Sequence, residues 1–325
     1  MSVEKKGIKN LRNIGIGLMV SALSFGGAYT GIEMSERNNS SLPSEASVEY
    51  RETTQGIYIG AILDNVMSGD GIMYYFDGDR YEGQFSEGLR DGSGKLTWSD
   101  GDVFDGYFVA DEIEGSGIYT YSDGAVYDGY FKNGKREGNG TFIYVNKDTY
   151  EGEWKDDVIE GKGLYTFANG DYIQGRFVNN KFDDGLFATK TEYGQLEIFI
   201  EDGEETGRIR FTETNGNSYD GNYVDGSFSG ECEVVFANGD SYSGNIDSNL
   251  KSGEGTYKWT DKSYYIGEWS SDQMSGKGIY YYGNGDRLEG SFSNNRPIGE
   301  CDYYKSGIKY KTQWDNDGVC TNVTE

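Results

Sequence analysis

The sequence predicts an all-β protein built from stacked β-hairpins. Three observations support this: an aromatic motif returns with a fixed period, as at Tyr81, Phe104 and Tyr127; glycine pairs recur at fixed offsets inside each period; and Asp-Gly or Asn-Gly dipeptides close most periods. The composition agrees, since the chain includes 50 Gly, 28 Tyr and 16 Phe but only 2 Pro and no His. Self-similarity at a fixed period of this length indicates a repeat architecture.

The N-terminus holds the one strongly apolar segment, residues 13–32, in which every side chain is uncharged. Four basic residues precede it: Lys5, Lys6, Lys9 and Arg12. An apolar run of about 20 residues spans a bilayer as a helix, and a basic flank predicts a cytoplasmic N-terminus. We therefore expect a cytoplasmic segment at residues 1–12 and a transmembrane signal anchor at 13–32, with export of the rest. The alternative is a signal peptide that is cut after Ala28.

Residues 33–56 are polar, Ser-rich and without periodicity, which predicts a disordered linker. Residues 315–325 follow the last recognisable motif and are expected to form a C-terminal tail. A short basic N-terminus, one apolar segment and an exported array together favour a bacterial source.

The repeat motif is typified by YEGEW at residues 150–154. Its copies start at Tyr58, Tyr81, Phe104, Tyr127, Tyr150, Ile173, Tyr219, Tyr242, Tyr265 and Leu288. The gap from 173 to 219 equals two periods and contains a degenerate copy at Leu196, and a partial copy starts at Tyr310. The predicted array therefore covers residues 57–314, with about eleven units and a partial one, and is degenerate at 173–218.

Each unit is expected to be one hairpin. Side chains alternate along a strand, so the motif's Tyr, Gly and Trp share one face. The Gly-x-Gly pair lies in the second strand, Asp-Gly supplies positive φ angles for a turn, and neighbouring hairpins must stack to be stable. Glycine leaves a gap that an aromatic ring from a neighbouring strand can cover. The expected structural positions are Tyr81, Gly83, Phe85, Gly92, Gly94, Tyr127, Gly129, Phe131, Tyr150, Gly152, Trp154, Gly161, Gly163, Tyr265, Gly267, Trp269, Gly276 and Gly278.

This combination of YEGEW, Gly-x-Gly and Asp-Gly at fixed offsets resembles the MORN repeat, the "membrane occupation and recognition nexus". The resemblance implies an elongated, twisted, single-layer antiparallel sheet. MORN repeats as a class are often credited with lipid binding. The net charge of −26 disfavours direct binding to anionic lipid and excludes a nucleic-acid partner.

Acidic residues follow seven of the unit starts: Glu82, Asp105, Asp128, Glu151, Glu197, Asp220 and Glu289. If the hairpins stack, these carboxylates form a column that is a candidate acidic interaction face. The competing interpretation is a solvated face that keeps an aromatic-rich sheet soluble.

The sequence offers little enzymatic chemistry. The lack of His removes the commonest general base, and a repeated column supplies no unique carboxylate pair for glycoside hydrolysis. Asp315-Asn316-Asp317-Gly318 fails the glycine spacing of an EF-hand loop. We therefore expect no catalytic residues, no cofactor and no metal site.

Three cysteines remain. Cys232 and Cys301 occupy the same place in units that are three periods apart, so they are not expected to pair. Cys301 and Cys320 fall in adjacent units, and their pairing stays open.

These features predict a membrane-tethered, non-enzymatic scaffold that binds an unknown protein partner. Open sheet ends would also allow a homo-oligomer. The alternatives are a cell-envelope carbohydrate-binding module that uses its aromatic rows, and an accessory subunit of an enzyme complex.

Overall fold

The computed structural model describes residues 47–324, which form 25 β-strands. The strands are β1 (Ser47–Glu52), β2 (Gly56–Leu63), β3 (Val66–Tyr75), β4 (Arg80–Ser86), β5 (Leu89–Thr97), β6 (Val103–Val109), β7 (Glu112–Thr120), β8 (Val126–Lys132), β9 (Lys135–Ile143), β10 (Thr149–Lys155), β11 (Val158–Thr166), β12 (Tyr172–Val178), β13 (Lys181–Thr191), β14 (Gly194–Glu201), β15 (Glu204–Glu213), β16 (Ser218–Val224), β17 (Ser227–Val235), β18 (Ser241–Asp247), β19 (Leu250–Lys258), β20 (Tyr264–Ser270), β21 (Gln273–Tyr281), β22 (Arg287–Ser293), β23 (Arg296–Lys305), β24 (Ile308–Trp314) and β25 (Cys320–Thr324). Within this part of the chain, no helix has the length and hydropathy to span a membrane. The predicted cytoplasmic segment and signal anchor lie outside the described residues.

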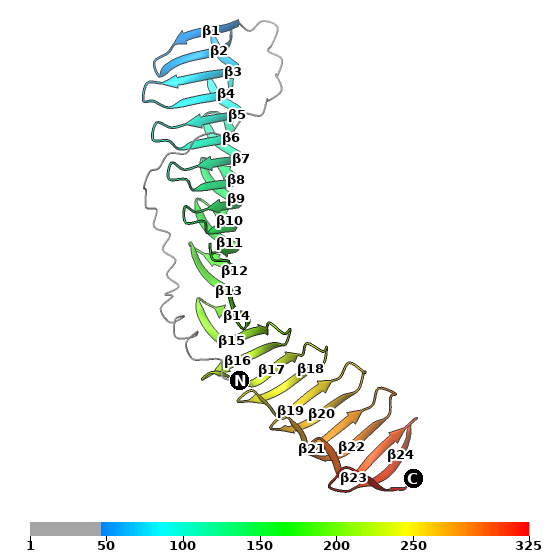
Figure 1. Cartoon of the computed structure of the whole chain (residues 1–325). Helices are drawn as coiled ribbons and strands as arrows, with labels where there is room; N and C mark the ends of the chain where they lie inside the picture. The colour runs from blue at the N-terminus through cyan, green and yellow to red at the C-terminus, as the bar shows by residue number, and fades with distance from the viewer. Residues whose placement is uncertain (1–46, 325) are drawn as a thin grey trace. The chain divides into compact units, whose positions relative to one another are not determined.

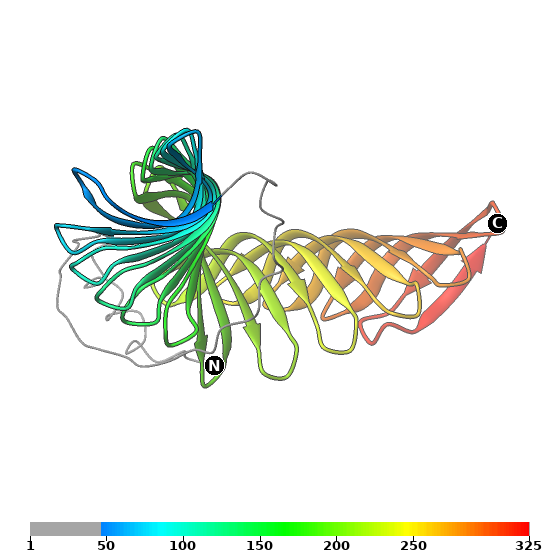
Figure 2. The same ribbon diagram turned by 90° about the horizontal axis from the view of Figure 1, so that it is seen from above.

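The described chain divides into two compact units, residues 47–185 and 186–324. In each unit the strands follow one another in chain order, and the recorded pairings are antiparallel (Figure 1). The strands are curved in both units (Figure 2). The boundary falls inside β13, within the segment that the sequence marks as degenerate.

The predicted hairpins are confirmed, but each repeat has two kinds of turn. The strands of one hairpin, such as β10 and β11, are joined by two residues, Asp156 and Asp157, with φ of 49° and 71°. Positive φ at both central residues suits the twist of a hairpin. The Asp-Gly dipeptides lie in the longer loops that lead to the next hairpin, where Gly101 has φ of 99° and its N–H donates to the Trp98 carbonyl.

A row of glycines crosses the sheet of the N-terminal unit, one from each strand from β2 to β12. Gly83 pairs with Gly94, Gly94 with Gly106, and the same register continues to Gly163 and Gly175. The row comprises Gly60, Gly71, Gly83, Gly94, Gly106, Gly117, Gly129, Gly140, Gly152, Gly163 and Gly175. The second glycine of each Gly-x-Gly belongs to this row.

The tyrosine at each unit start lies over this row. A Cβ on Gly94 or on Gly83 would overlap the ring of Tyr81, which is fully buried. The Tyr81 hydroxyl donates to the Gln84 carbonyl at 2.9 Å, and Tyr150 donates to Glu153 in the same way at 3.1 Å. The ring therefore covers a glycine of its own strand as well as one of the paired strand. The expectation of a ring from a neighbouring strand was only half correct.

The first glycine of each Gly-x-Gly has a different role. Gly92 and Gly161 have φ of 105° and 104°, and the register between paired strands shifts beside them. A bulge of this kind needs a left-handed residue, which glycine adopts without steric cost.

Two strands lie where no repeat was expected. Ser47–Glu52 forms β1, although residues 33–56 were predicted to be a disordered linker, and Cys320–Thr324 forms β25 inside the predicted tail. Each pairs with the adjacent strand, β2 or β24, because an open sheet edge offers unpaired N–H and C=O groups.

Candidate binding face of the repeats

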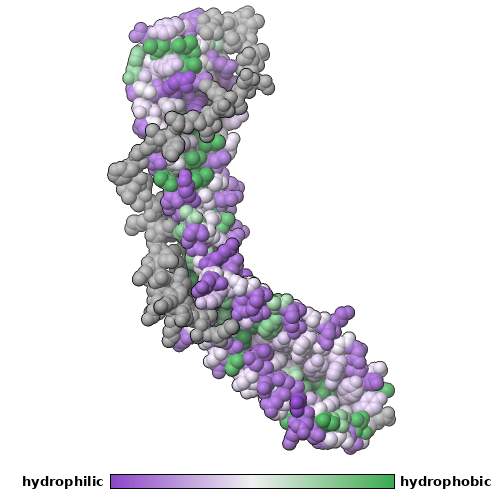
Figure 3. All heavy atoms as spheres, viewed as in Figure 1, coloured by the Kyte–Doolittle hydropathy of each residue, from purple (hydrophilic) through white to green (hydrophobic). Residues whose placement is uncertain are grey.

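The sheet of each unit has two chemically different faces. The tyrosine face carries the unit-start aromatics and the rings four places later, such as Tyr150 and Trp154. The acid face carries the residues between them, such as Glu151. In the view of Figure 3 the visible surface is largely hydrophilic, with apolar patches over both units.

Buried rings on the tyrosine face contact one another edge to face from one repeat to the next. Tyr81 contacts Phe85 and Phe108 at centroid distances of 5.1 Å each, and Tyr150 contacts Trp154 at 5.4 Å and Phe177 at 5.3 Å. Such pairs contribute about 0.5–1.5 kcal/mol each beyond the area that they bury. These rings form the core, so they are not a free binding surface.

A second set of rings lies fifteen and seventeen places after the unit starts, and most of them are half-buried. We call this set the aromatic ladder. In the N-terminal unit it comprises Trp98, Tyr119, Tyr121, Phe142, Tyr144, Tyr165 and Phe167, with successive centroids 4.5–5.6 Å apart. In the C-terminal unit it comprises Phe236, Tyr257, Trp259, Tyr280, Tyr282 and Tyr303, with successive centroids 4.7–6.1 Å apart.

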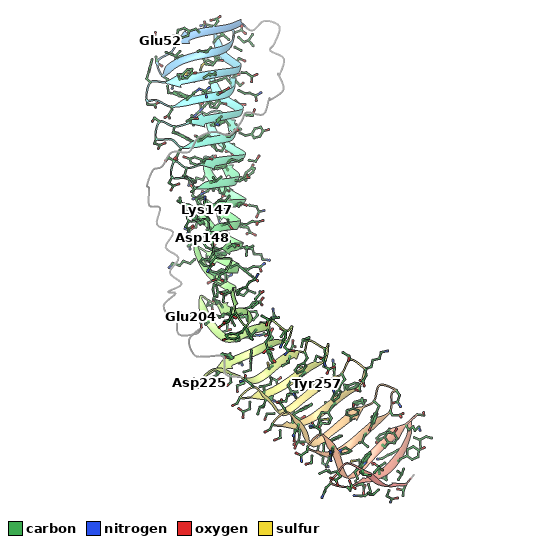
Figure 4. The ribbon with its side chains drawn as sticks, in the orientation of Figure 1. Glu52, Lys147, Asp148, Glu204, Asp225 and Tyr257 are labelled. Atoms are coloured by element: carbon green, nitrogen blue, oxygen red, sulfur yellow. The ribbon has the colours of Figure 1, made fainter. Side chains whose placement is uncertain are left out.

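In several repeats, an acidic residue in the loop before the hairpin ties the ladder to the preceding repeat. Asp148, which lies in the β9–β10 loop (Figure 4), accepts a hydrogen bond from the Tyr165 hydroxyl at 2.6 Å and another from the Ala168 N–H at 2.8 Å. Asp102 holds Tyr119 and Ser122 in the same way. We call this arrangement the carboxylate latch. Burial of the Tyr165 ring, reinforced by the Asp148 carboxylate, raises the pKa of Tyr165 well above its ordinary value.

The latch recurs in the C-terminal unit. The Tyr257 hydroxyl, on β19 (Figure 4), donates to Asp240 at 2.9 Å, and Tyr303 donates to Asp286 at 2.8 Å. These latch residues were not among the positions predicted from the sequence. Their signal was available, because Asp and Tyr recur at one fixed spacing in several repeats.

Three cations lie on the tyrosine face nine places after unit starts: Arg90, Arg136 and Lys251. Arg136 lies over the Trp154 ring at 4.3 Å and donates through Nε to Asp157 of the next turn at 3.0 Å. Arg90 pairs with Asp111 in the same manner at 2.9 Å. These cations therefore join neighbouring repeats.

A cavity of about 420 Å³ opens on the tyrosine face of the N-terminal unit, beside Trp98. Its lining includes Tyr75, Asp79, Arg90, Leu96 and Trp98. A second cavity of about 470 Å³ is lined in part by Glu137, Glu153, Trp154, Glu160 and Arg176.

The residues of the predicted acidic column differ in exposure, and a lysine lies among them. Glu82, Asp128, Glu151 and Glu289 are exposed and Asp105 is half-buried. Cross-strand pairing places Lys95 between Glu82 and Asp105. The use of these carboxylates as an interaction face stays a prediction.

Two members of the column, Glu197 and Asp220, are held by arginines. Arg210 bridges Glu197 at 3.0 Å and Asp220 at 2.7 Å, while Arg208 contacts Asp220 at 2.7 Å. Burial opposes ionisation of Asp220, but hydrogen bonds from both arginines outweigh it and lower the pKa of this carboxyl. These two acids are occupied in joining β14, β15 and β16.

All three cysteines are free; Cys232 and Cys301 are buried and Cys320 is exposed. The expectation that Cys232 and Cys301 do not pair is confirmed, and the open Cys301–Cys320 pairing is not formed. In the C-terminal unit, Cys232 and Cys301 occupy positions that correspond to those of the glycine row, and their sulfur atoms lie against Gly221 and Gly290 in place of a tyrosine ring.

Comparison with known proteins gives a family match. The MORN-repeat family model matches residues 58–80, 81–103, 104–126, 127–149, 150–172, 219–241, 242–264 and 265–287. The units at 173 and 196, which we expected to be degenerate, are not among these segments, and neither is the unit at Leu288. No curated protein matches the chain.

Two solved structures illustrate the structural similarities. The TCP domain of SAS-4 (dCPAP) from Drosophila melanogaster, in complex with a proline-rich motif of Ana2 (dSTIL), is 16% identical; the match covers 61% of this chain and 88% of that chain, with a TM-score of 0.24. The TCP10 domain of Danio rerio CPAP, in complex with a peptide of Danio rerio STIL, is 14% identical; that match covers 82% and 99%, with a TM-score of 0.25. Similarities this low say nothing about the function of the chain.

Since the eight matched segments make up more than half of the chain, this protein belongs to the MORN-repeat family.

Proposed function

We propose that this protein is a non-enzymatic scaffold that is tethered to a membrane through residues 13–32 and presents its exported repeat array to a protein partner. The observation that carries the proposal is the aromatic ladder, most of whose rings are only partly buried along the tyrosine face of each unit. Accessible aromatic area beside polar groups is typical of surfaces that bind other proteins.

The geometry of the ladder favours a protein partner over a polysaccharide. Each interior ring contacts a ring on either side; Tyr121, for example, lies 4.5 Å from Tyr119 and 5.6 Å from Phe142. Sugar binding to aromatic rows uses free ring faces, whereas the interior rings of the ladder are already in contact with other rings on either side.

Cys320 provides a test of export. It is the exposed cysteine of the described chain, so a membrane-impermeant maleimide added to intact cells should label it if the array is exported. Cys320→Ser is the matched control, because buried Cys232 and Cys301 remain. Labelling that appears only after cell lysis would contradict the export proposal.

Partner binding is tested by cross-linking the full chain in cells, capturing it and identifying adducts by mass spectrometry, with binding to purified cell-wall polysaccharide measured in parallel. A discrete protein adduct supports the scaffold. Saturable polysaccharide binding without a protein adduct would favour the carbohydrate-binding alternative and contradict the proposal.

A further inference from the structure

Two positions of each repeat vary together. One is the ladder position fifteen places after the unit start, and the other is the latch position in the loop before the hairpin. Where that position holds Asp102, Asp148, Asp240 or Asp286, the ring is a tyrosine whose hydroxyl donates to the carboxylate. Where it holds Ala125, the ring is Phe142, which has no hydroxyl. The rule follows from hydrogen bonding, because a buried phenol needs a partner and a phenylalanine does not.

The pair Asp79 and Leu96 breaks this rule. Asp79 accepts the Ser99 N–H at 2.8 Å, as the other latch carboxylates accept theirs, but the corresponding ring position holds leucine. Asp171 also has no tyrosine at the corresponding ring position, but its second carboxylate oxygen accepts a hydrogen bond from the Asn169 side-chain amide at 2.8 Å. The oxygen in question is the second carboxylate oxygen, the one that does not accept the backbone N–H. In the part of the chain that the structure describes, Asp79 is the one latch acid whose second oxygen has neither a tyrosine nor an asparagine donor.

The same position interrupts the aromatic ladder. Tyr75 and Trp98 stand where ladder rings stand in other repeats, but no ring contact joins them among the described residues. The space between them is the cavity of about 420 Å³, and Tyr75, Asp79, Leu96 and Trp98 all contribute to its lining. The cavity therefore lacks one ring and one hydroxyl donor relative to the rest of the ladder.

The charges around the cavity select what enters it. Asp77, Asp79, Asp111 and Glu112 line it, and the cation in the lining, Arg90, is already bound to Asp111. The whole chain carries a net charge of −26. A segment that approaches this cavity gains from carrying Lys or Arg on either side of the inserted group.

We propose that this cavity binds a tyrosine side chain of a basic segment of the partner protein. The ring fills the missing rung between Tyr75 and Trp98, and its hydroxyl donates to Asp79. This inference rests on the proposed scaffold function and names the chemistry of the partner. A buried tyrosine in a pocket is a typical anchor of a protein interface.

The first test uses the full chain, purified in mild detergent, and three synthetic peptides in which Tyr, Phe or Leu is flanked by two lysines on each side. Calorimetric titration should give saturable binding, with the Tyr peptide about tenfold tighter than the Phe peptide, since a hydrogen bond to a charged acceptor is gained. The Leu peptide should bind more weakly still. Equal binding of all three would show charge attraction alone and would overturn the proposal.

Two variants change the cavity in opposite ways. In Leu96→Tyr, the chain's own tyrosine ring should fill the cavity. This variant should therefore abolish peptide binding and raise the unfolding midpoint. Asp79→Ala recreates the combination seen at Ala125 and should remove the preference for Tyr over Phe while binding persists. Tyr119→Phe, which alters the neighbouring latch, is the matched control and should keep the Tyr preference. A Leu96→Tyr chain that is folded and binds the Tyr peptide as wild type does would refute the cavity as the site.

The same variants separate this inference from the scaffold proposal. If cells yield one protein adduct with wild type and an equal amount with Leu96→Tyr, the scaffold stands and the cavity proposal fails. If the peptide pattern holds but wild type captures no protein, the cavity is a tyrosine site and the scaffold proposal fails.

Discussion

At the scale of single residues, the fold depends on a tyrosine lying over two glycines. The Tyr150 ring covers Gly152 of its own strand and Gly163 of the paired strand, and its hydroxyl reaches the Glu153 carbonyl. Glycine in a strand normally lowers stability, but here it makes room for a ring that is fully buried. One kind of contact, a tyrosine ring over two glycines, therefore accounts for the abundance of both residue types.

Gly163→Ala should destabilise the array because the added Cβ overlaps the Tyr150 ring. Overpacking of this kind costs about 1–3 kcal/mol of unfolding free energy, measured by denaturant titration. Lys162→Ala, on the exposed neighbouring residue, should stay within about 0.5 kcal/mol of wild type. Equal effects of the two changes would disprove the ring-over-glycine account.

The buried tyrosines predict loss of stability at alkaline pH. Burial raises the pKa of Tyr58 and of Tyr127 to about 12 each, above the value near 10 of the unfolded chain. The unfolded state then releases protons that the folded state keeps, so the unfolding free energy should fall as pH rises from 10 to 12. Denaturant midpoints across this range measure the slope, and Tyr127→Phe should make it shallower. A flat profile up to pH 12 would be inconsistent with these buried phenols.

At the scale of the hairpin, two-residue turns set the register and also join repeats. Asp157 has φ of 71° in the β10–β11 turn, and its carboxylate accepts from the Arg136 backbone N–H of the preceding hairpin at 3.0 Å. Asn180 caps Ile159 in the same way at 2.8 Å. Turn side chains thus fix each hairpin to its neighbour.

Ala110 is the weak residue of these turns. It has φ of 48°, a left-handed conformation that costs an alanine about 1 kcal/mol and that asparagine tolerates. Ala110→Asn should therefore raise the unfolding free energy by about 0.5–1 kcal/mol. Ala237→Asn, at a loop residue whose own φ is not positive, should give no gain. A loss of stability in Ala110→Asn would show that the turn does not hold this conformation.

Much of the hairpin could be predicted from the sequence, since the period-two spacing of Tyr150, Gly152 and Trp154 is enough to assign a strand and its face. The turn at Asp156 and Asp157 could not be predicted in this way, because it lacks the glycine that usually marks a tight turn. Its positive φ angles are imposed by the pairing of the two strands. β1 and β25 have no repeat motif and form by pairing with an existing edge. The arginines on Asp220 and the gap beside Asp79 depend on cross-strand register, which one sequence does not display directly.

At the scale of the whole molecule, repetition makes exceptions informative. Residues that recur from unit to unit, such as the latch acids and the buried rings, hold the array together. A position that departs from this repeat pattern and leaves a cavity is where we propose that the array binds its partner. In the N-terminal unit that position is Leu96, beside Asp79.

The most direct test of this central claim is photo-cross-linking of the full chain in cells. A photoreactive residue is placed at exposed Glu112, which lines the cavity, or at exposed Lys95 on the acid face. We predict a discrete protein adduct from position 112, none from position 95, and loss of the adduct when Leu96→Tyr fills the cavity. An adduct from position 95 alone, or one from position 112 that Leu96→Tyr leaves undiminished, would contradict the account.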